Sequence, residues 1–532
     1  MLSKQGSIFS STLIVASTIG LSRLFGFMRY RVLAGYFPKE ELDVYFAAFR
    51  IPDMVFEVLI TGALASAFIP IFIKYQKNKD DLSYHMSSII TVVCSAMFIS
   101  VIVLTLLAPF IIPLITPGFS EEKLKQVVFL SQLLLLGQLP FLVASNILTS
   151  IGQAQKTFII TSFAPVAYNI VIIAVTVFGA SQWALLAPTL GVVVGAIVMF
   201  AMQIPLMRSA EFTLRVLFKI TSGTREFFRI MVPRLVTVLA AQIDATVDLT
   251  LASFLGAGSY TIFYLAQHLQ LLPVSIIGIA FGQASLPYLS ELYREKKLSE
   301  FTHLITESIV SVLLVTIPIA SFFIFARTPI VRLFFGGQMF DWEATVLTAQ
   351  TLSYFALAIP AHAVYYFLTR CYYAVFDTRT PFVISLIAIG INVCISMLGV
   401  FVFHQGVWIL ALSFSISMIT NVFLLLVLLS KKQLGIEYNL FIKQVIKIII
   451  ATIIASFFVY CGMKIADGLI LDTARSINVF LLVMVGGITY VGIYAYITWL
   501  LGVESIGEVA AMIQRLKKYR QRILEIYTDF AS

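Results

Sequence analysis

The chain carries few charges, few cysteines and no nucleotide-binding motif. Charged residues make up only 12% of the 532 residues and hydrophobic residues 60%, whereas a soluble domain has about 25% charged residues. This balance excludes an ordinary soluble protein. Four cysteines occur singly, which disfavours a disulfide framework or a zinc site. The lack of a P-loop and of a G-x-S-x-G motif argues against a built-in ATPase or a nucleophilic enzyme.

Long uncharged runs dominate instead. Residues 87–120 and 157–207 contain no charged side chain, and each run can cross a hydrocarbon core of about 30 Å. Alternating strand patterns are absent, so the spans are helical. We predict an all-α polytopic membrane protein with fourteen spans, at about 8–36, 42–74, 86–114, 123–153, 158–179, 183–206, 226–256, 260–292, 303–326, 342–373, 381–403, 406–430, 441–463 and 476–502.

The chain also repeats itself at a spacing of about 220 residues. Leu139-Pro140 is echoed by Ile359-Pro360, and Asn169 by Asn392. Six spans per copy is an even number, so both copies insert the same way up as parallel repeats. We therefore predict an N-terminal lobe (1–206), a cytoplasmic linker (207–225), a C-terminal lobe (226–430), two extra spans (431–502) and a basic amphipathic tail (503–532).

The positive charge is placed asymmetrically. The net charge is +9, but the lysines and arginines gather in alternate loops, as the positive-inside rule requires, and not in a nucleic-acid-binding patch. This places both termini of the multi-pass protein in the cytoplasm. There is no pattern of a cleavable signal peptide. The tail is expected to lie on the anionic inner leaflet, with a solvated helix as the alternative.

Charges within the spans point to function, because a central charge costs about 2.5–3.5 kcal/mol. The first two spans carry Arg23, Arg29, Arg31, Asp43, Arg50, Asp53 and Glu57. The last four lie in a stripe roughly 80° wide on one helix face. Arginine suits bidentate phosphate binding, so we expect a cavity for an anionic, phosphate-bearing substrate. The alternative is a salt-bridge cluster that joins spans one and two.

The second half offers a candidate cation site. Asp248, Asn392 and Ser396 could form an oxygen-rich site for a hard cation such as Na⁺. A proton site or a hydrogen-bonded core aspartate are the alternatives for Asp248. Span eight carries His268, which is either a protonated substrate contact or a neutral, hydrogen-bonded histidine.

Several motifs resemble those of the MurJ (MviN) lipid II flippases of the MOP exporter superfamily. They are residues 22–29 (SRLFGFMR), 43–52 (DVYFAAFRIP), 116–119 (TPGF), 163–169 (FAPVAYN) and 376–381 (FDTRTP). The resemblance implies fourteen helices, two lobes around a central cavity, and a transporter rather than an enzyme. It implies alternating-access movement of lipid II to the outer leaflet of the bacterial inner membrane. Its implied partners are membrane lipids and cell-wall synthesis proteins.

Residue by residue, Arg23 and Arg29 match the family's cavity arginines, and Asp43 its helix-two aspartate. His268 stands where the family has a substrate-contacting arginine. Asp248 and Asn392 match the Na⁺ site, in which Ser396 replaces a carboxylate. Phe56 and Thr61 also depart from the pattern. A related exporter of another undecaprenyl-linked saccharide, or of small molecules driven by Na⁺ or H⁺, is the alternative function.

Overall fold

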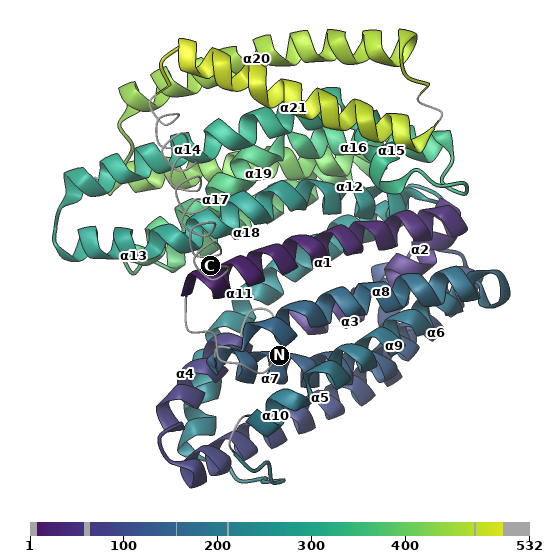
Figure 1. The fold of residues 1–532 in the computed structure, drawn as a ribbon, viewed down its shortest axis with the longest axis vertical. Coiled ribbons are helices and arrows are strands. Elements are labelled where there is room, and N and C mark those ends of the chain that lie inside the picture. The colour runs from purple at the N-terminus through teal and green to yellow at the C-terminus, as the bar shows by residue number, and fades with distance from the viewer. Residues whose placement is uncertain are drawn as a thin grey trace, which may run out of the picture. The chain divides into compact units, whose positions relative to one another are not determined.

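The structure is a computed structural model that describes residues 8–57, 64–155, 157–209, 212–432, 434–472 and 475–503. These residues form helices joined by short turns, and no strand occurs among them (Figure 1). This confirms the predicted all-helical membrane fold. Thr61 and the predicted tail beyond Val503 lie outside the described residues.

Ten described helices are long and apolar enough to cross a membrane, or eleven if a bent pair counts as one span. They match ten of the predicted spans, and the bent pair matches the span predicted at 342–373. The predicted spans 8–36, 42–74 and 226–256 do not meet the same criterion within the described ranges. The chain is thus a multi-pass membrane protein, and the count of fourteen stays a prediction.

Contacts divide the chain into two compact units. The first comprises Met1–Tyr264, Phe334–Thr345 and Ser396–Val407, and the second comprises Leu265–Leu333, Val346–Ile395 and Trp408–Ser532. The lobe boundaries predicted from the repeat stay a prediction.

The first unit begins with the helices that carry the charged residues. Its helices are α1 (Ile8–Tyr36), α2 (Lys39–Ala48), α3 (Arg50–Phe56), α4 (Ala65–Tyr75), α5 (Lys79–Ile115), α6 (Glu121–Gly137), α7 (Leu139–Ala154), α8 (Phe158–Trp183), α9 (Leu186–Gln203), α10 (Pro205–Ser209), α11 (Ser222–Ser253) and the first turns of α12 (Ser259–Val274). Helix α8 packs between α1 and α9. An added Cβ on Gly195 of α9 would lie 3.0 Å from the Tyr168 carbonyl oxygen of α8, so the missing side chain permits this close packing.

The second unit holds the remaining helices. They are α13 (Ala280–Arg294), α14 (Leu298–Phe325), α15 (Arg327–Phe335) up to Leu333, α16 (Trp342–Ala356) from Val346, α17 (Ala358–Ala374), α18 (Arg379–Met397) up to Ile395, α19 (Trp408–Lys431), α20 (Tyr438–Leu469) and α21 (Ser476–Leu500), with a π-helical turn at Ser275–Ile279. A second π-helical turn, at Leu398–Val402, belongs to the first unit. Helices α20 and α21, coloured yellow-green and yellow, lie side by side, and α20 packs on α14 (Figure 1). Ser456 of α20 hydrogen-bonds Ser321 of α14 at 2.7 Å and Tyr490 of α21 at 3.2 Å.

Prolines explain three breaks in the predicted spans. Pro52 and Pro360 each lie four residues after the last residue of a helix, Ala48 and Ala356, and Pro140 lies three residues after Gly137, the end of α6. A proline has no N–H to bond the carbonyl four residues earlier. The third break bends α16 and α17 by 43°. The predicted second span, 42–74, therefore begins with two short helices, α2 and α3, over which Asp43, Arg50 and Asp53 are distributed, and it ends with α4.

Candidate substrate site

Arg29 is the candidate phosphate-binding side chain of the first unit and lies on α1. Its side chain is half-buried on α1, and its Cζ atom lies 4.9 Å from the centroid of the Tyr30 ring, a cation–π distance. Its Nε atom is buried and has no hydrogen-bond partner among the described residues. Four tyrosines lie around the guanidinium: Tyr30, Tyr45, Tyr168 and Tyr264. Arg23, six residues earlier, is exposed on the same helix.

The charges of α1 and α3 lie near one another. Asp53 is half-buried on α3 and interacts electrostatically with Arg50, Glu57 and Arg29. Within the part of the chain that the structure describes, neither Arg29 nor Asp53 forms a direct ion pair. A cation in an apolar span is costly when it lacks a bound anion. The geometry therefore suits an anionic ligand better than a closed salt-bridge cluster.

Arg50 is held by α11 instead. Its Nη2 donates to the Gln242 carbonyl at 2.6 Å and to the Gln242 Oε1 atom at 3.1 Å. Its Nε and Nη2 donate to the Thr246 Oγ1 atom at 2.9 and 2.7 Å. Gln242 and Thr246 lie one turn apart on one face of α11, a spacing that could have identified them in the sequence. Arg50 thus has fewer free donors for a ligand than Arg29.

Asp43 is fully buried and caps the start of α12. Its carboxylate accepts the Gly258 N–H at 2.6 Å, the Thr261 N–H at 2.9 Å and the Thr261 hydroxyl at 2.9 Å. The first N–H groups of a helix have no intrahelical partner and carry positive partial charge, so a carboxylate is well suited to them. Asp43 therefore joins α2 to the start of α12, more than 200 residues later in the chain, within the first unit.

Glycine is required at this contact. Gly258 has φ +86°, and an added Cβ would lie 2.5 Å from the Lys39 Cγ atom. A side chain here would be strained by the backbone angle and would clash with α2. Substitution of Gly258 would therefore separate the Asp43 carboxylate from the amides that it accepts.

Two lysines complete the contact. The Lys123 Nζ atom lies 3.4 Å from Asp43 Oδ2. Lys39, which is largely buried, pairs with Glu343 at 2.7 Å and Asp341 at 3.4 Å. Burial alone would lower the pKa of Lys39, but its hydrogen bond to Glu343 and the charge of Asp341 raise the pKa above its usual value. Lys39 is therefore charged at neutral pH.

The remaining predicted residues lie elsewhere. His268 is half-buried on α12, one turn after Tyr264. Asp248 on α11, Asn392 on α18 and Ser396 on α18 are all buried. No group of three His, Cys, Asp or Glu side chains that could hold a metal ion occurs within the described ranges. The grouping of Asp248, Asn392 and Ser396 into a Na⁺ site stays a prediction.

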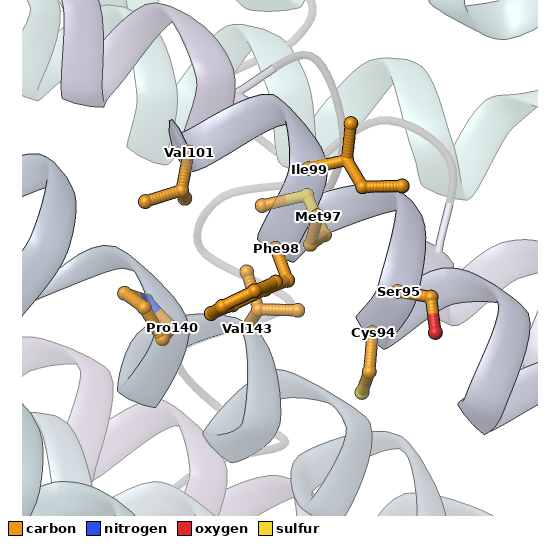
Figure 2. Close-up of a pocket in the computed structure, with 8 residues that line it drawn as sticks. All are labelled: Cys94, Ser95, Met97, Phe98, Ile99, Val101, Pro140 and Val143. Atoms are coloured by element: carbon orange, nitrogen blue, oxygen red, sulfur yellow. The ribbon is translucent and has the colours of Figure 1, made fainter. Parts of the chain in front are cut away.

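An apolar pocket of about 510 Å³ lies apart from the charged residues, between α5 and α7 (Figure 2). Its lining residues are Cys94, Ser95, Met97, Phe98, Ile99, Val101, Pro140 and Val143. None of these residues is charged, so the pocket offers no cation to a phosphate.

Two relatives described as probable lipid II flippases align with most of the chain. A probable lipid II flippase MurJ of Rickettsia prowazekii is 25% identical over 401 residues, which are 74% of this chain and 78% of that protein. A probable lipid II flippase MurJ of Buchnera aphidicola is 26% identical over 487 residues, which are 88% of this chain and 93% of that protein.

Solved structures agree with this assignment. A lipid II flippase MurJ in an inward closed conformation matches with a TM-score of 0.74 and 25% identity, over 91% of this chain and 98% of that one. An inward-facing multidrug MATE transporter of the MOP superfamily matches with a TM-score of 0.66 but only 12% identity, over 77% of this chain and 94% of that one, and shows the fold alone. The sequence model of the family described as lipid II flippase MurJ matches residues 37–477. Because that match covers more than half of the chain, the chain belongs to the MurJ family of lipid II flippases.

Proposed function

We infer that the chain is a flippase that moves lipid II, the lipid-linked peptidoglycan precursor, between the leaflets of the membrane. The observation that carries this inference is the family match over residues 37–477. The chain is a transporter rather than an enzyme. The multidrug alternative has less support, because its structural likeness is limited to the fold.

The pyrophosphate of the substrate is the group that the charged side chains would bind. Arg29 has a buried Nε atom without a partner among the described residues, and an arginine donates two parallel hydrogen bonds to a phosphate. Arg23, Asp53 and Glu57 are proposed to line the same path, with Arg50 as a residue that positions α3 against α11. His268 is proposed to contact the substrate from α12.

Alternating access requires one side of the protein to open while the other stays closed. The Asp43 contact lies where α1 has crossed the membrane and α2 begins, which is the outer side if the N-terminus is cytoplasmic. The contact joins segments of the two predicted repeats, so we propose that it closes the outer side and breaks when the substrate is released there.

The proposed location and partners follow from the distribution of cations and from the family. We propose the bacterial inner membrane as the location, with both termini in the cytoplasm, because cations gather in the loops on that side. Proteins of cell-wall synthesis are proposed as partners, and membrane lipids surround the apolar helices. Nucleic acid is not expected to bind.

Growth complementation tests the proposed function. Expression of this chain in a bacterium depleted of its own lipid II flippase should restore growth, because a single activity is missing. The empty vector and the native flippase are the controls. If the full-length chain inserts into the membrane and growth fails, lipid II is not the substrate in that host.

We propose Na⁺ as the coupling ion, because Asp248, Asn392 and Ser396 are buried and carry the oxygen donors that hard cations accept. NaCl should then raise the melting temperature of the purified protein above that in KCl at equal ionic strength. Na⁺ at ten times its Kd would stabilise by about 1.4 kcal/mol. Asp248→Asn should abolish the difference in melting temperature between NaCl and KCl, whereas Asp244→Asn, one turn away, should preserve it. Equal melting temperatures for the unsubstituted protein in both salts would count against Na⁺.

A further inference from the structure

The linker between α10 and α11 is an extended segment that lies along α5. The Thr213 N–H donates to the Ser83 hydroxyl at 3.1 Å, the Arg215 N–H to Ser87 at 3.0 Å, and the Leu217 N–H to Thr91 at 3.1 Å. Ser83, Ser87 and Thr91 are spaced by four residues and therefore share one face of α5. Alternate linker amides are satisfied by this row of hydroxyl groups.

The segment then turns back along the same helix. The Ser88 hydroxyl donates to the Lys219 carbonyl, and Thr221 hydrogen-bonds the His85 ring at 2.9 Å. Thr221 also caps α11 by accepting the Thr224 N–H at 3.2 Å. The linker thus runs along α5 as far as Thr91 and returns, with Leu217 and Phe218 at its tip.

The outer face of the linker is apolar and flanked by cations. The exposed fractions of alternate side chains are 42% for Leu214, 79% for Val216, 75% for Phe218 and 67% for Ile220. Arg215 and Lys219 lie between them and are exposed as well. A cluster of large exposed apolar side chains normally marks a contact surface, and the adjacent cations favour an anionic partner.

The position along α5 identifies the partner as the membrane. Helix α5 has 37 residues and is therefore about 55 Å long, whereas the hydrocarbon core is about 30 Å thick. If the excess is divided between the ends, the core begins about 12 Å into the helix, near Ser87. Asp80 and Asp81 at the helix start lie in water, and no Asp, Glu, Lys or Arg follows them on α5. The linker tip therefore lies at the boundary between head groups and acyl chains.

We propose that residues 212–221 form a membrane-interface anchor, in which Val216 and Phe218 insert among the acyl chains and Arg215 and Lys219 bind anionic phospholipid head groups. With the proposed cytoplasmic location of both termini, this leaflet is the cytoplasmic one. Amphipathic segments of this kind bind through apolar burial and attraction to anionic lipid together. Because Thr221 caps α11, the anchor also fixes the start of α11 relative to the bilayer.

Spin labels at single cysteines test the insertion. The full chain, with its four native cysteines replaced by serine, would be reconstituted in nanodiscs containing phosphatidylglycerol. Labels at Val216→Cys and Phe218→Cys should collide more often with O₂, which concentrates in lipid, than with a water-soluble nickel chelate. A label at Thr213→Cys, near the start of the segment, should show the opposite preference. Greater collision with the nickel chelate at position 218 would place the tip in water and overturn the proposal.

The two other outcomes are equally decisive. Low collision with both reagents at position 218 would mean that protein covers the tip, and would also overturn membrane insertion. Replacing phosphatidylglycerol by phosphatidylcholine should reduce the insertion depth of the Phe218→Cys label, and Arg215→Gln with Lys219→Gln should remove this dependence on lipid charge. An insertion depth that ignores lipid charge would remove the two cations from the proposal. These readouts do not require transport, so the anchor can fail while lipid II transport holds.

Discussion

Arg29→Ala is expected to abolish lipid II transport while the protein remains folded in the membrane. The guanidinium lies over Tyr30 and has a buried Nε atom without a partner among the described residues, so its removal breaks no structural hydrogen bond there. A charge-assisted hydrogen bond contributes about 1.5–3 kcal/mol. Loss of two such bonds to a pyrophosphate would weaken substrate binding by about 100-fold or more. The measurements are lipid II binding to purified protein and growth complementation.

Two further variants give this test its specificity. Arg29→Lys keeps the charge but not the bidentate geometry, so its binding should be intermediate. Arg229→Ala removes an exposed arginine from α11 and should leave binding and growth unchanged. Normal binding in Arg29→Ala would contradict the assignment of Arg29 to the pyrophosphate.

Asp43→Asn should weaken the closed state of the outer side. The carboxylate accepts three hydrogen bonds from Gly258 and Thr261 and lies 3.4 Å from Lys123. An asparagine has one acceptor oxygen and no charge, so it can replace only part of this cap. A loss of about 3 kcal/mol would shift the equilibrium between closed and open states by about 100-fold.

Distance measurements between two spin labels would report this shift. Labels at Glu41→Cys and Ala257→Cys lie on exposed positions beside the contact. Asp43→Asn should add a population with a longer separation, and Glu122→Gln, an exposed carboxylate on α6, should not. An unchanged distance distribution in Asp43→Asn, in protein that has lost transport, would indicate that Asp43 acts on the substrate and not on closure.

The sequence predicted the helical membrane fold because apolar composition and span length determine it locally. The same properties predicted the positions of most helices. The prolines that separate α2 from α3 and bend α16 against α17 can also be read from the sequence. The capping role of Asp43 could not be predicted, because its partners lie 215 and 218 residues away in the sequence. Hydrogen bonds over such separations depend on the packing of helices that periodicity does not describe.

The charged residues of the candidate site could be predicted from the sequence, but the tyrosines around them could not. The arginines and carboxylates of spans one and two stood out because charge is rare in an apolar span. Tyr45 and Tyr168, which lie near Arg29, did not stand out, because tyrosine is common in membrane helices. The linker was predicted only as a cytoplasmic connection, although the serine and threonine spacing on α5 carried a signal for its docking.

The accessibility of lipid II from outside the cell tests the central claim most directly. In a strain in which this chain is the only lipid II flippase, a membrane-impermeant hydrolase added to the outside should cleave lipid II. In the same strain carrying Arg29→Ala, lipid II should accumulate and stay protected. Protection of lipid II in cells that contain the unsubstituted chain, under conditions in which the native flippase exposes it, would contradict the proposed function.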